Sequence, residues 1–179
     1  MPDRFSLIVD KYREFTDSLL NKGILPLRET SNGFWGISVC EEVFELFKKI
    51  RLQQYSSFLD IGSGDGRVAA IASLFTNAVG IESDKELYEK SVKIKEELEL
   101  ECEFVNKDFY EYDVSKFEVV YCFPDSVDYR FEKKMSEELK GKLVMSGANS
   151  GLNGLNEDKR IVILGNRFLV YSKREIKGL

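Results

Sequence analysis

Histidine is absent from the 179 residues, and cysteine, proline and methionine occur only three times each. Without an imidazole the chain cannot build a histidine-based nucleophilic triad, so any proton transfer falls to carboxylates, tyrosines, lysines or water. The three cysteines, Cys40, Cys102 and Cys122, form no Cys-x-x-Cys pair, and we expect no disulfide and no metal site. The chain also shows no run of about 18 apolar residues and no charged-then-apolar leader, which predicts a cytoplasmic protein without a membrane span.

Length and charge limit the domain organisation and the partners that the chain can have. We expect residues 1–179 to form one domain, on which residues 1–37 pack as a helix and a loop. The formal net charge is −5, yet residues 148–179 carry six basic against three acidic side chains. The acidic body disfavours DNA as a partner and suits a basic one. The alternative interpretation of this charge is an ordinary solvated surface.

The most informative segment is Phe58 to Arg67, where a short apolar run leads into a turn almost free of side chains. Its three glycines are Gly62, Gly64 and Gly66. They let the backbone turn tightly and approach a ligand, while the start of the next helix offers unpaired N–H groups. The dinucleotide fingerprint needs a glycine where this chain has Arg67. Asp60 would repel a pyrophosphate but pair with a cation, which favours a cofactor bearing an ammonium or sulfonium group.

This segment resembles motif I of the class I S-adenosylmethionine (SAM) methyltransferases, in which such an acid lies near the amino-acid end of the cofactor. The next two strand ends continue the resemblance. Glu82 closes the second strand and looks like the clamp for the ribose diol, a device that NAD enzymes share. Asp108 and Phe109 follow the third strand and look like the residues that meet the adenine amino group and ring. The alternatives are a helix cap for either acid and a core position for Phe109.

The resemblance implies SAM as cofactor and an α/β fold, a Rossmann-like doubly wound sheet that is mostly parallel, with added N-terminal helices. Apolar spacing predicts helices over residues 5–21 and 39–51, the second opened by a capping box of Ser38 and Glu41. Strands and helices then alternate up to residue 145, as a parallel sheet requires.

The end of the chain separates this class from the nicotinamide-binding Rossmann domains. Two apolar segments, 161–164 and 168–171, flank a turn of Gly165, Asn166 and Arg167, which predicts an antiparallel hairpin. Class I methyltransferases finish their sheet with such a hairpin. We interpret residues 148–158, rich in glycine, asparagine and serine, as a loop.

Trp35 and Phe34 stand in a glycine-flanked segment, residues 24–37, that we interpret as a loop. The family often covers its cofactor at this place, and a ring there would attract a sulfonium through a cation–π contact. The alternative role for Trp35 is to pack the N-terminal helix onto the domain.

The fourth strand ends in Phe123, Pro124 and Asp125, where the family places groups that face the substrate. This is not the Asn-Pro-Pro-Tyr motif of adenine methyltransferases, so amino methylation of DNA bases is disfavoured. Residues 119–146 resemble the small archaeal protein-lysine methyltransferases. That resemblance implies that Tyr121 and Asp125 are catalytic, receiving an amine and helping it to arrive neutral. The alternatives are a core aromatic for Tyr121 and a turn or cap for Asp125.

We therefore predict a SAM-dependent methyltransferase, with a protein lysine as the leading acceptor. Methylation of a small molecule or an RNA remains open, as do a non-catalytic SAM-binding module and a nicotinamide-binding protein. The sequence does not identify the acceptor or the oligomeric state.

Overall fold

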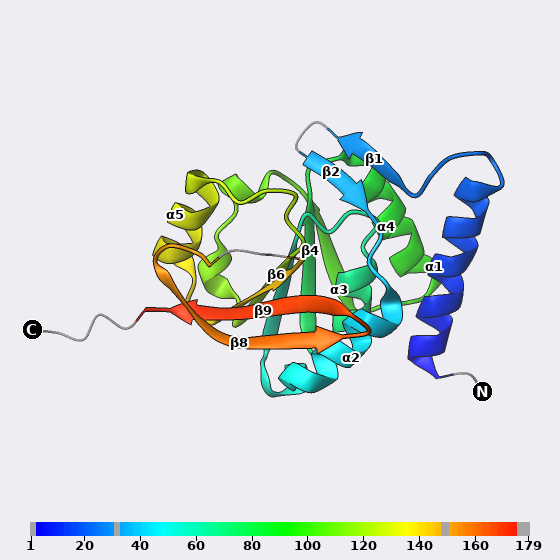
Figure 1. Cartoon of the computed structure of the whole chain (residues 1–179). Helices are drawn as coiled ribbons and strands as arrows, with labels where there is room; N and C mark the ends of the chain where they lie inside the picture. Colours follow the sequence, from blue (N-terminus) through cyan, green and yellow to red (C-terminus); the bar gives the residue numbers. More distant parts are fainter. Residues whose placement is uncertain (1–2, 31–32, 148–150, 175–179) are drawn as a thin grey trace, which may run out of the picture.

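The computed structural model describes residues 3–30, 33–147 and 151–174. Its main sheet consists of β3 (Ser57–Ile61), β4 (Asn77–Glu82), β5 (Cys102–Asn106), β6 (Val119–Cys122), β7 (Lys142–Ser146), β8 (Leu155–Ile163) and β9 (Asn166–Lys173). These strands are ordered β5-β4-β3-β6-β7-β9-β8 (Figure 1). The five strands β3 to β7 are parallel, and β9 pairs antiparallel with both β7 and β8. This arrangement confirms the predicted Rossmann-like sheet with its antiparallel hairpin.

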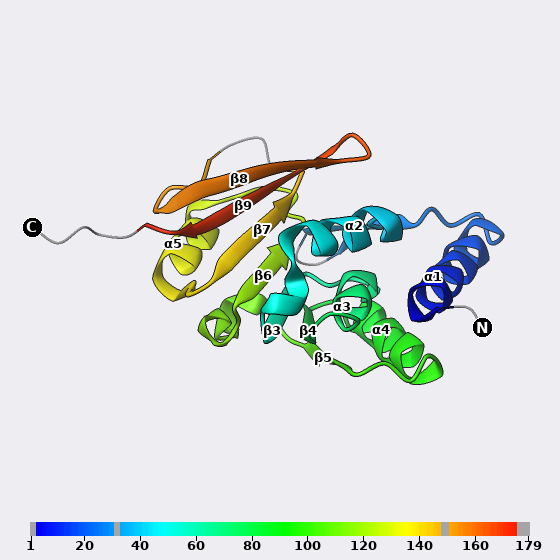
Figure 2. The ribbon, with the colours of Figure 1, turned by 90° about the horizontal axis from the view of Figure 1, so that it is seen from below.

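Helices cover both faces of this sheet (Figure 2). They are α1 (Arg4–Leu20), α2 (Cys40–Ile50), α3 (Arg67–Ala72), α4 (Lys85–Glu97) and α5 (Tyr129–Glu138), joined by the 3-10 turns η1 (Leu52–Gln54), η2 (Phe109–Glu111) and η3 (Val114–Lys116). Successive strand residues point to opposite faces, so Phe58 joins the core beneath α1 to α4 while Leu59 joins the core beneath α5. None of the helices in the described residues is long and apolar enough to cross a membrane.

The segment predicted to be a loop over residues 24–37 is instead a small hairpin. Its strands β1 (Leu27–Thr30) and β2 (Gly33–Gly36) pair with each other and with no strand of the main sheet. The capping box is also wrong, because Val39 is the N-cap of α2 and no side chain caps that helix.

The C-terminal hairpin is confirmed, with its turn one residue earlier than predicted. Leu164 and Gly165 both have positive φ, 48° and 91°, as a tight two-residue turn requires. The predicted loop over residues 148–158 is wrong from Leu155 onward, where β8 begins. Residues 148–150 of that prediction lie outside the described residues. An edge strand exposes polar side chains to solvent, so the polar start of β8 carries no apolar alternation that could reveal it.

Candidate active site

A cavity of about 770 Å³ opens at the carboxyl ends of the parallel strands, beneath the hairpin β1–β2. Nine of the ten residues singled out in the sequence line it: Trp35, Asp60, Gly62, Gly64, Glu82, Asp108, Phe109, Tyr121 and Asp125. The tenth, Gly66, does not. A side chain at Gly66 would collide with Phe104 and Ser91, so this glycine permits close packing between α3, β5 and α4. The fold thus brings together residues that are far apart in the sequence.

The glycine loop between β3 and α3 forms the floor of the cavity. Gly62 and Gly64 have φ values of 67° and 54°, in the left-handed region that side chains disfavour. A Cβ at Gly62 would meet nothing within 4 Å. A Cβ at Gly64 would lie only 2.5 Å from Cδ1 of Trp35, so the indole rests directly on the loop.

Asp60 is the most unusual carboxylate of the site. Its side chain is on the buried end of β3, with only 2% of the residue exposed, and the backbone N–H of Ala69 lies near one of its oxygens. Within the described part of the chain, Oδ2 of Asp60 has no hydrogen-bond partner, and neither has the buried Oγ of Ser63. Burial, and then repulsion by Glu82 and Asp65, raises the pKa of Asp60 well above its usual value. A buried acceptor without a donor is costly, so this site favours a ligand that brings a donor or a positive charge.

Glu82 joins the glycine loop to the start of α4. Its Oε2 accepts a hydrogen bond from the N–H of Gly64 and its Oε1 accepts one from the N–H of Asp84, both at 2.8 Å. Each carboxylate oxygen has two acceptor positions, so Glu82 keeps capacity for two hydroxyl groups. Its role as a ribose clamp stays a prediction.

Asp108 and Phe109 make the structural contacts weighed for them and also line the cavity, while their contacts with an adenine stay a prediction. Asp108 caps η2 by accepting from the N–H of Tyr110 at 2.9 Å, and it also lines the cavity. The ring of Phe109 lies 4.0 Å from that of Tyr110 and 6.0 Å from that of Phe131, measured between centroids. One part of Phe109 packs in the protein while another part borders the cavity, where an adenine ring would lie.

Three contacts fix the hairpin β1–β2 above the cavity. Arg28 pairs with Asp84 at 3.0 Å and with Glu86 at 3.2 Å, both near the start of α4. On the other side the N–H of Phe34 donates to the carboxylate of Asp125. Between these two anchors lies the indole of Trp35, described above. These contacts hold the hairpin in place over the cavity.

Trp35 has contacts on two sides, with the glycine loop and with the N-terminal helix. Besides covering Gly64, its ring lies 6.4 Å from the ring of Phe15 on α1. It therefore contacts both the cofactor loop and the N-terminal helix. Whether it attracts a sulfonium stays a prediction.

The two predicted catalytic residues differ in their surroundings. Tyr121 is buried, its ring 6.4 Å from those of Phe47 and Phe58, and its hydroxyl lies near the side chains of Ser38 and Ser146. Burial raises the pKa of Tyr121, which keeps the hydroxyl protonated at neutral pH. Asp125 lines the cavity at the end of β6 and holds the hairpin through Phe34. Their catalytic roles stay predictions.

Sequence reasoning missed a buried ion pair behind the glycine loop. Arg67 and Asp65 lie 2.6 Å apart, and the guanidinium also lies 5.0 Å from the centre of the Tyr12 ring. The hydroxyl of Tyr12 donates to the carbonyl of Asp65, and Arg67 donates to the carbonyl of Ser38. These bonds tie α1 and the start of α2 to the loop. The only available signal was Arg67 at the position where the dinucleotide fingerprint has glycine.

Comparisons with known proteins agree with this architecture. Residues 24–125 match a family model described as "Histone methylation protein DOT1". No curated protein matches the sequence.

Solved structures with a similar fold include three methyltransferases. An RNA methyltransferase from Salinibacter ruber, in complex with S-adenosyl-L-homocysteine, has a TM-score of 0.69 and 24% identity over 78% of this chain and 95% of its own. A ribosomal protein L11 methylase from Lactobacillus delbrueckii subsp. bulgaricus has a TM-score of 0.62 and 12% identity, covering 79% and 81%. The Pyrococcus abyssi tRNA (uracil-54, C5)-methyltransferase, also with S-adenosyl-L-homocysteine, has a TM-score of 0.61 and 17% identity, covering 86% and 52%. At these identities the likeness shows the fold alone.

Proposed function

Because the chain belongs to the family described as histone methylation protein DOT1 and is a SAM-dependent methyltransferase, we propose that its methyl acceptor is a lysine side chain of a protein. The description of the family names a protein as the methylated molecule, which supports this acceptor. The cavity supplies a second, independent argument, which begins with the cofactor.

The cavity residues fit SAM in charge and in hydrogen-bonding capacity. The unpartnered oxygens of Asp60 and Ser63 suit the amino-acid end of the cofactor, since an ammonium group donates to both. Glu82 has acceptor capacity for the ribose hydroxyls, and Asp108 with Phe109 borders the place of the adenine. When bound, SAM supplies a methyl group activated by a sulfonium. The protein then has to align the acceptor with that methyl group and exclude water.

The single observation that carries the lysine proposal is the chemistry of the cavity mouth. Asp125 and Asp128 line the cavity, in which the described residues supply six carboxylates against two guanidinium groups, Arg67 and Arg130. Arg67 is already paired with Asp65, so the lining keeps a net negative charge. Phe34 and Phe123, also in the lining, remain 52% and 54% exposed. Carboxylates attract the ammonium of a lysine, and exposed rings accept its four methylene groups. An RNA backbone would be repelled by the same carboxylates.

The acceptor amine must lose a proton before it can attack the methyl group. The hydroxyl of Tyr121 stays protonated, as argued above, so it can accept a hydrogen bond from the amine but cannot take its proton at neutral pH. The carboxylate of Asp125 retains acceptor capacity beyond its bond from Phe34, so it can orient the incoming amine. Water at the mouth then receives the proton.

The test is a transfer assay with radiolabelled SAM and a cell lysate separated into protein, RNA and small-molecule fractions. We expect label in the protein fraction, and none there with Glu82→Gln. Glu103→Gln is the matched control, because Glu103 is exposed on the edge strand β5 and should leave transfer unchanged. Label confined to the RNA or the small-molecule fraction would exclude a lysine acceptor.

A further inference from the structure

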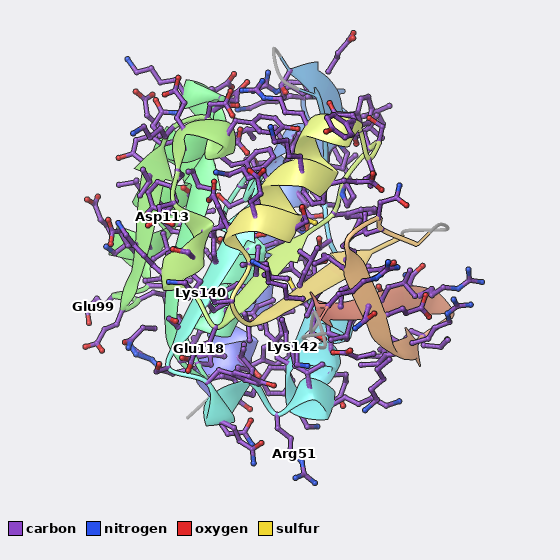
Figure 3. All side chains as sticks on the ribbon, turned by 90° about the vertical axis from the view of Figure 1, so that its left-hand side faces the viewer. Arg51, Glu99, Asp113, Glu118, Lys140 and Lys142 are labelled. Carbon is purple, nitrogen blue, oxygen red and sulfur yellow. The ribbon has the colours of Figure 1, made fainter. Side chains whose placement is uncertain are left out.

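A groove lies at the end of the sheet where the parallel strands begin. The active-site cavity lies at the opposite end, where these strands finish. It consists of two adjoining hollows of about 850 Å³ and 470 Å³, and both are lined by Tyr55 and Lys142. We call the two hollows together the basic groove. In Figure 3 its residues Arg51, Glu118 and Lys142 lie at the end of the molecule away from the hairpin β1–β2.

Seven cationic side chains line the basic groove, against two carboxylates, Glu118 and Asp158. Lys116, Lys140, Lys142 and Lys173 line the larger hollow, and Lys49, Arg51 and Lys159 line the smaller one. This excess of positive charge stands in a chain whose formal net charge is −5. The charge of the protein is therefore distributed asymmetrically. The cavity at the carboxyl ends of the parallel strands is acidic, and the groove at their amino ends is cationic.

The sheet register explains why cations from distant parts of the sequence gather here. Lys142 is the first residue of β7 and pairs with Ser172 of β9. The next residue of β9, Lys173, pairs with Leu155 of β8. Lys159 stands opposite Val170 on the same pair of strands. Lys49 and Arg51 come from the end of α2, and Lys116 and Lys140 from the segments that precede β6 and β7.

The two carboxylates of the groove are already engaged. Glu118 accepts from the N–H and the hydroxyl of Ser56. Asp158 accepts from Lys142 at 2.6 Å and from the hydroxyl of Ser172 at 2.8 Å. Five cations make no ion pair within the described part of the chain: Lys49, Arg51, Lys140, Lys159 and Lys173, of which Lys173 donates to the carbonyl of Glu137. Their charges face solvent.

We infer that the basic groove binds the phosphodiester backbone of a nucleic acid. A nucleic acid carries one negative charge on every nucleotide, so an extended strand can contact cations along the whole groove. The groove crosses four neighbouring strands, β6, β7, β9 and β8, a width of about 14 Å at about 4.8 Å a step. Along the axis of a duplex each strand has one phosphate every ~3.4 Å, so this width spans about four phosphates of one strand.

This inference departs from the sequence argument against DNA as a partner, which rested on net charge. Net charge sums over the whole chain, whereas binding depends on the local potential of one face. The acidic cavity still disfavours a nucleic acid as methyl acceptor. The groove would hold the nucleic acid at a distance from the chemistry.

The test measures fluorescence anisotropy of labelled RNA and DNA oligonucleotides of equal length, titrated with the whole chain at several salt concentrations. Four phosphate contacts predict that the affinity for duplex DNA falls about 100-fold when salt rises from ~50 to ~200 mM. The combined variant Lys49→Glu, Lys140→Glu and Lys159→Glu should bind at least ~10-fold more weakly, and its salt slope should be smaller by about 1 for each lost contact. SAM affinity, measured by calorimetry, should stay the same, because the groove and the cavity lie at opposite ends of the parallel strands.

The matched control reverses three exposed lysines elsewhere: Lys22→Glu, Lys93→Glu and Lys133→Glu. It has the same net charge as the groove variant, and it should bind nucleic acid like the unaltered chain. Circular dichroism and thermal melting check that both variants fold. Equal weakening in the two variants, or no binding at low salt, would overturn the inference. Displacement by polyglutamate at equal charge concentration would assign the groove to acidic polypeptides and overturn it too. The comparison of RNA with DNA identifies which backbone is preferred.

Discussion

Replacing Asp60 by asparagine should move protein stability and SAM affinity in opposite directions. Asparagine has nearly the same shape and keeps a carbonyl oxygen for the N–H of Ala69, but it removes the buried negative charge at Oδ2. The charge is unfavourable while the cavity lacks a cation, because the carboxylate is 2% exposed and faces Glu82 and Asp65. The same charge becomes favourable once an ammonium or sulfonium group lies beside it.

The affinity loss follows from the strength of charged hydrogen bonds. Such a bond is worth about 1.5–3 kcal/mol, and about 1.4 kcal/mol changes a binding constant tenfold. Asp60→Asn should therefore weaken SAM binding roughly 10- to 150-fold, as measured by isothermal titration calorimetry. Asp113→Asn removes a carboxylate of equal charge from the exposed start of η3 and should leave the affinity unchanged.

The stability gain should depend on pH. Because the pKa of Asp60 is raised in the folded chain, folding favours the protonated carboxyl. The contribution of this carboxyl to stability is fully present below its unfolded pKa, about 3.9, and is lost as pH rises through the raised pKa. Asparagine does not ionise. The variant should therefore melt at a higher temperature than the unaltered chain near pH 8, and the difference should vanish near pH 4. Unchanged SAM affinity in a folded variant, or a lower melting temperature near pH 8, would refute this reasoning.

Other substitutions test the remaining contacts of the cavity. Glu82→Ala should cost about 1.5–3 kcal/mol of SAM binding in calorimetry, since a charged acceptor is lost; an unchanged affinity would remove Glu82 from the cofactor site. If Trp35 attracts the sulfonium, Trp35→Leu should lower the ratio of SAM to S-adenosylhomocysteine affinity by about 0.5–2 kcal/mol. A lower melting temperature with an unchanged ratio would leave Trp35 a packing role only. Asp125→Asn should weaken the anchor of Phe34 and reduce kcat far more than SAM binding, because transition-state alignment is lost while cofactor contacts remain; equal losses in both would place Asp125 in the cofactor site.

The parts of the fold that were predictable from the sequence are those with a strong local pattern. The apolar runs of the parallel strands, the glycines after β3 and the helical spacing of α1 and α2 each follow from local chemistry. Nine of the ten proposed site residues reach one cavity because the carboxyl ends of parallel strands share one edge of the sheet. Gly66 is the exception, since spacing alone does not tell a glycine needed for packing from one that faces a ligand.

The rest depends on contacts between distant segments. The hairpin β1–β2 lacks apolar alternation and is held by Asp84, Glu86 and Asp125, which the sequence places far away. The first half of β8 is polar because it lies at the sheet edge. The basic groove could not be predicted from the sequence either, because its cations come from separate strands and from α2.

The most direct test of the central claim is to locate the transferred methyl group itself. The purified chain is incubated with a lysate protein fraction and SAM carrying a deuterium-labelled methyl group, and peptides are then analysed by tandem mass spectrometry. We predict labelled methyl groups on Nζ of lysine side chains, absent when Asp60→Asn replaces the unaltered chain at a SAM concentration below the weakened Kd. Label found on RNA nucleotides or small molecules but on no lysine would contradict the account.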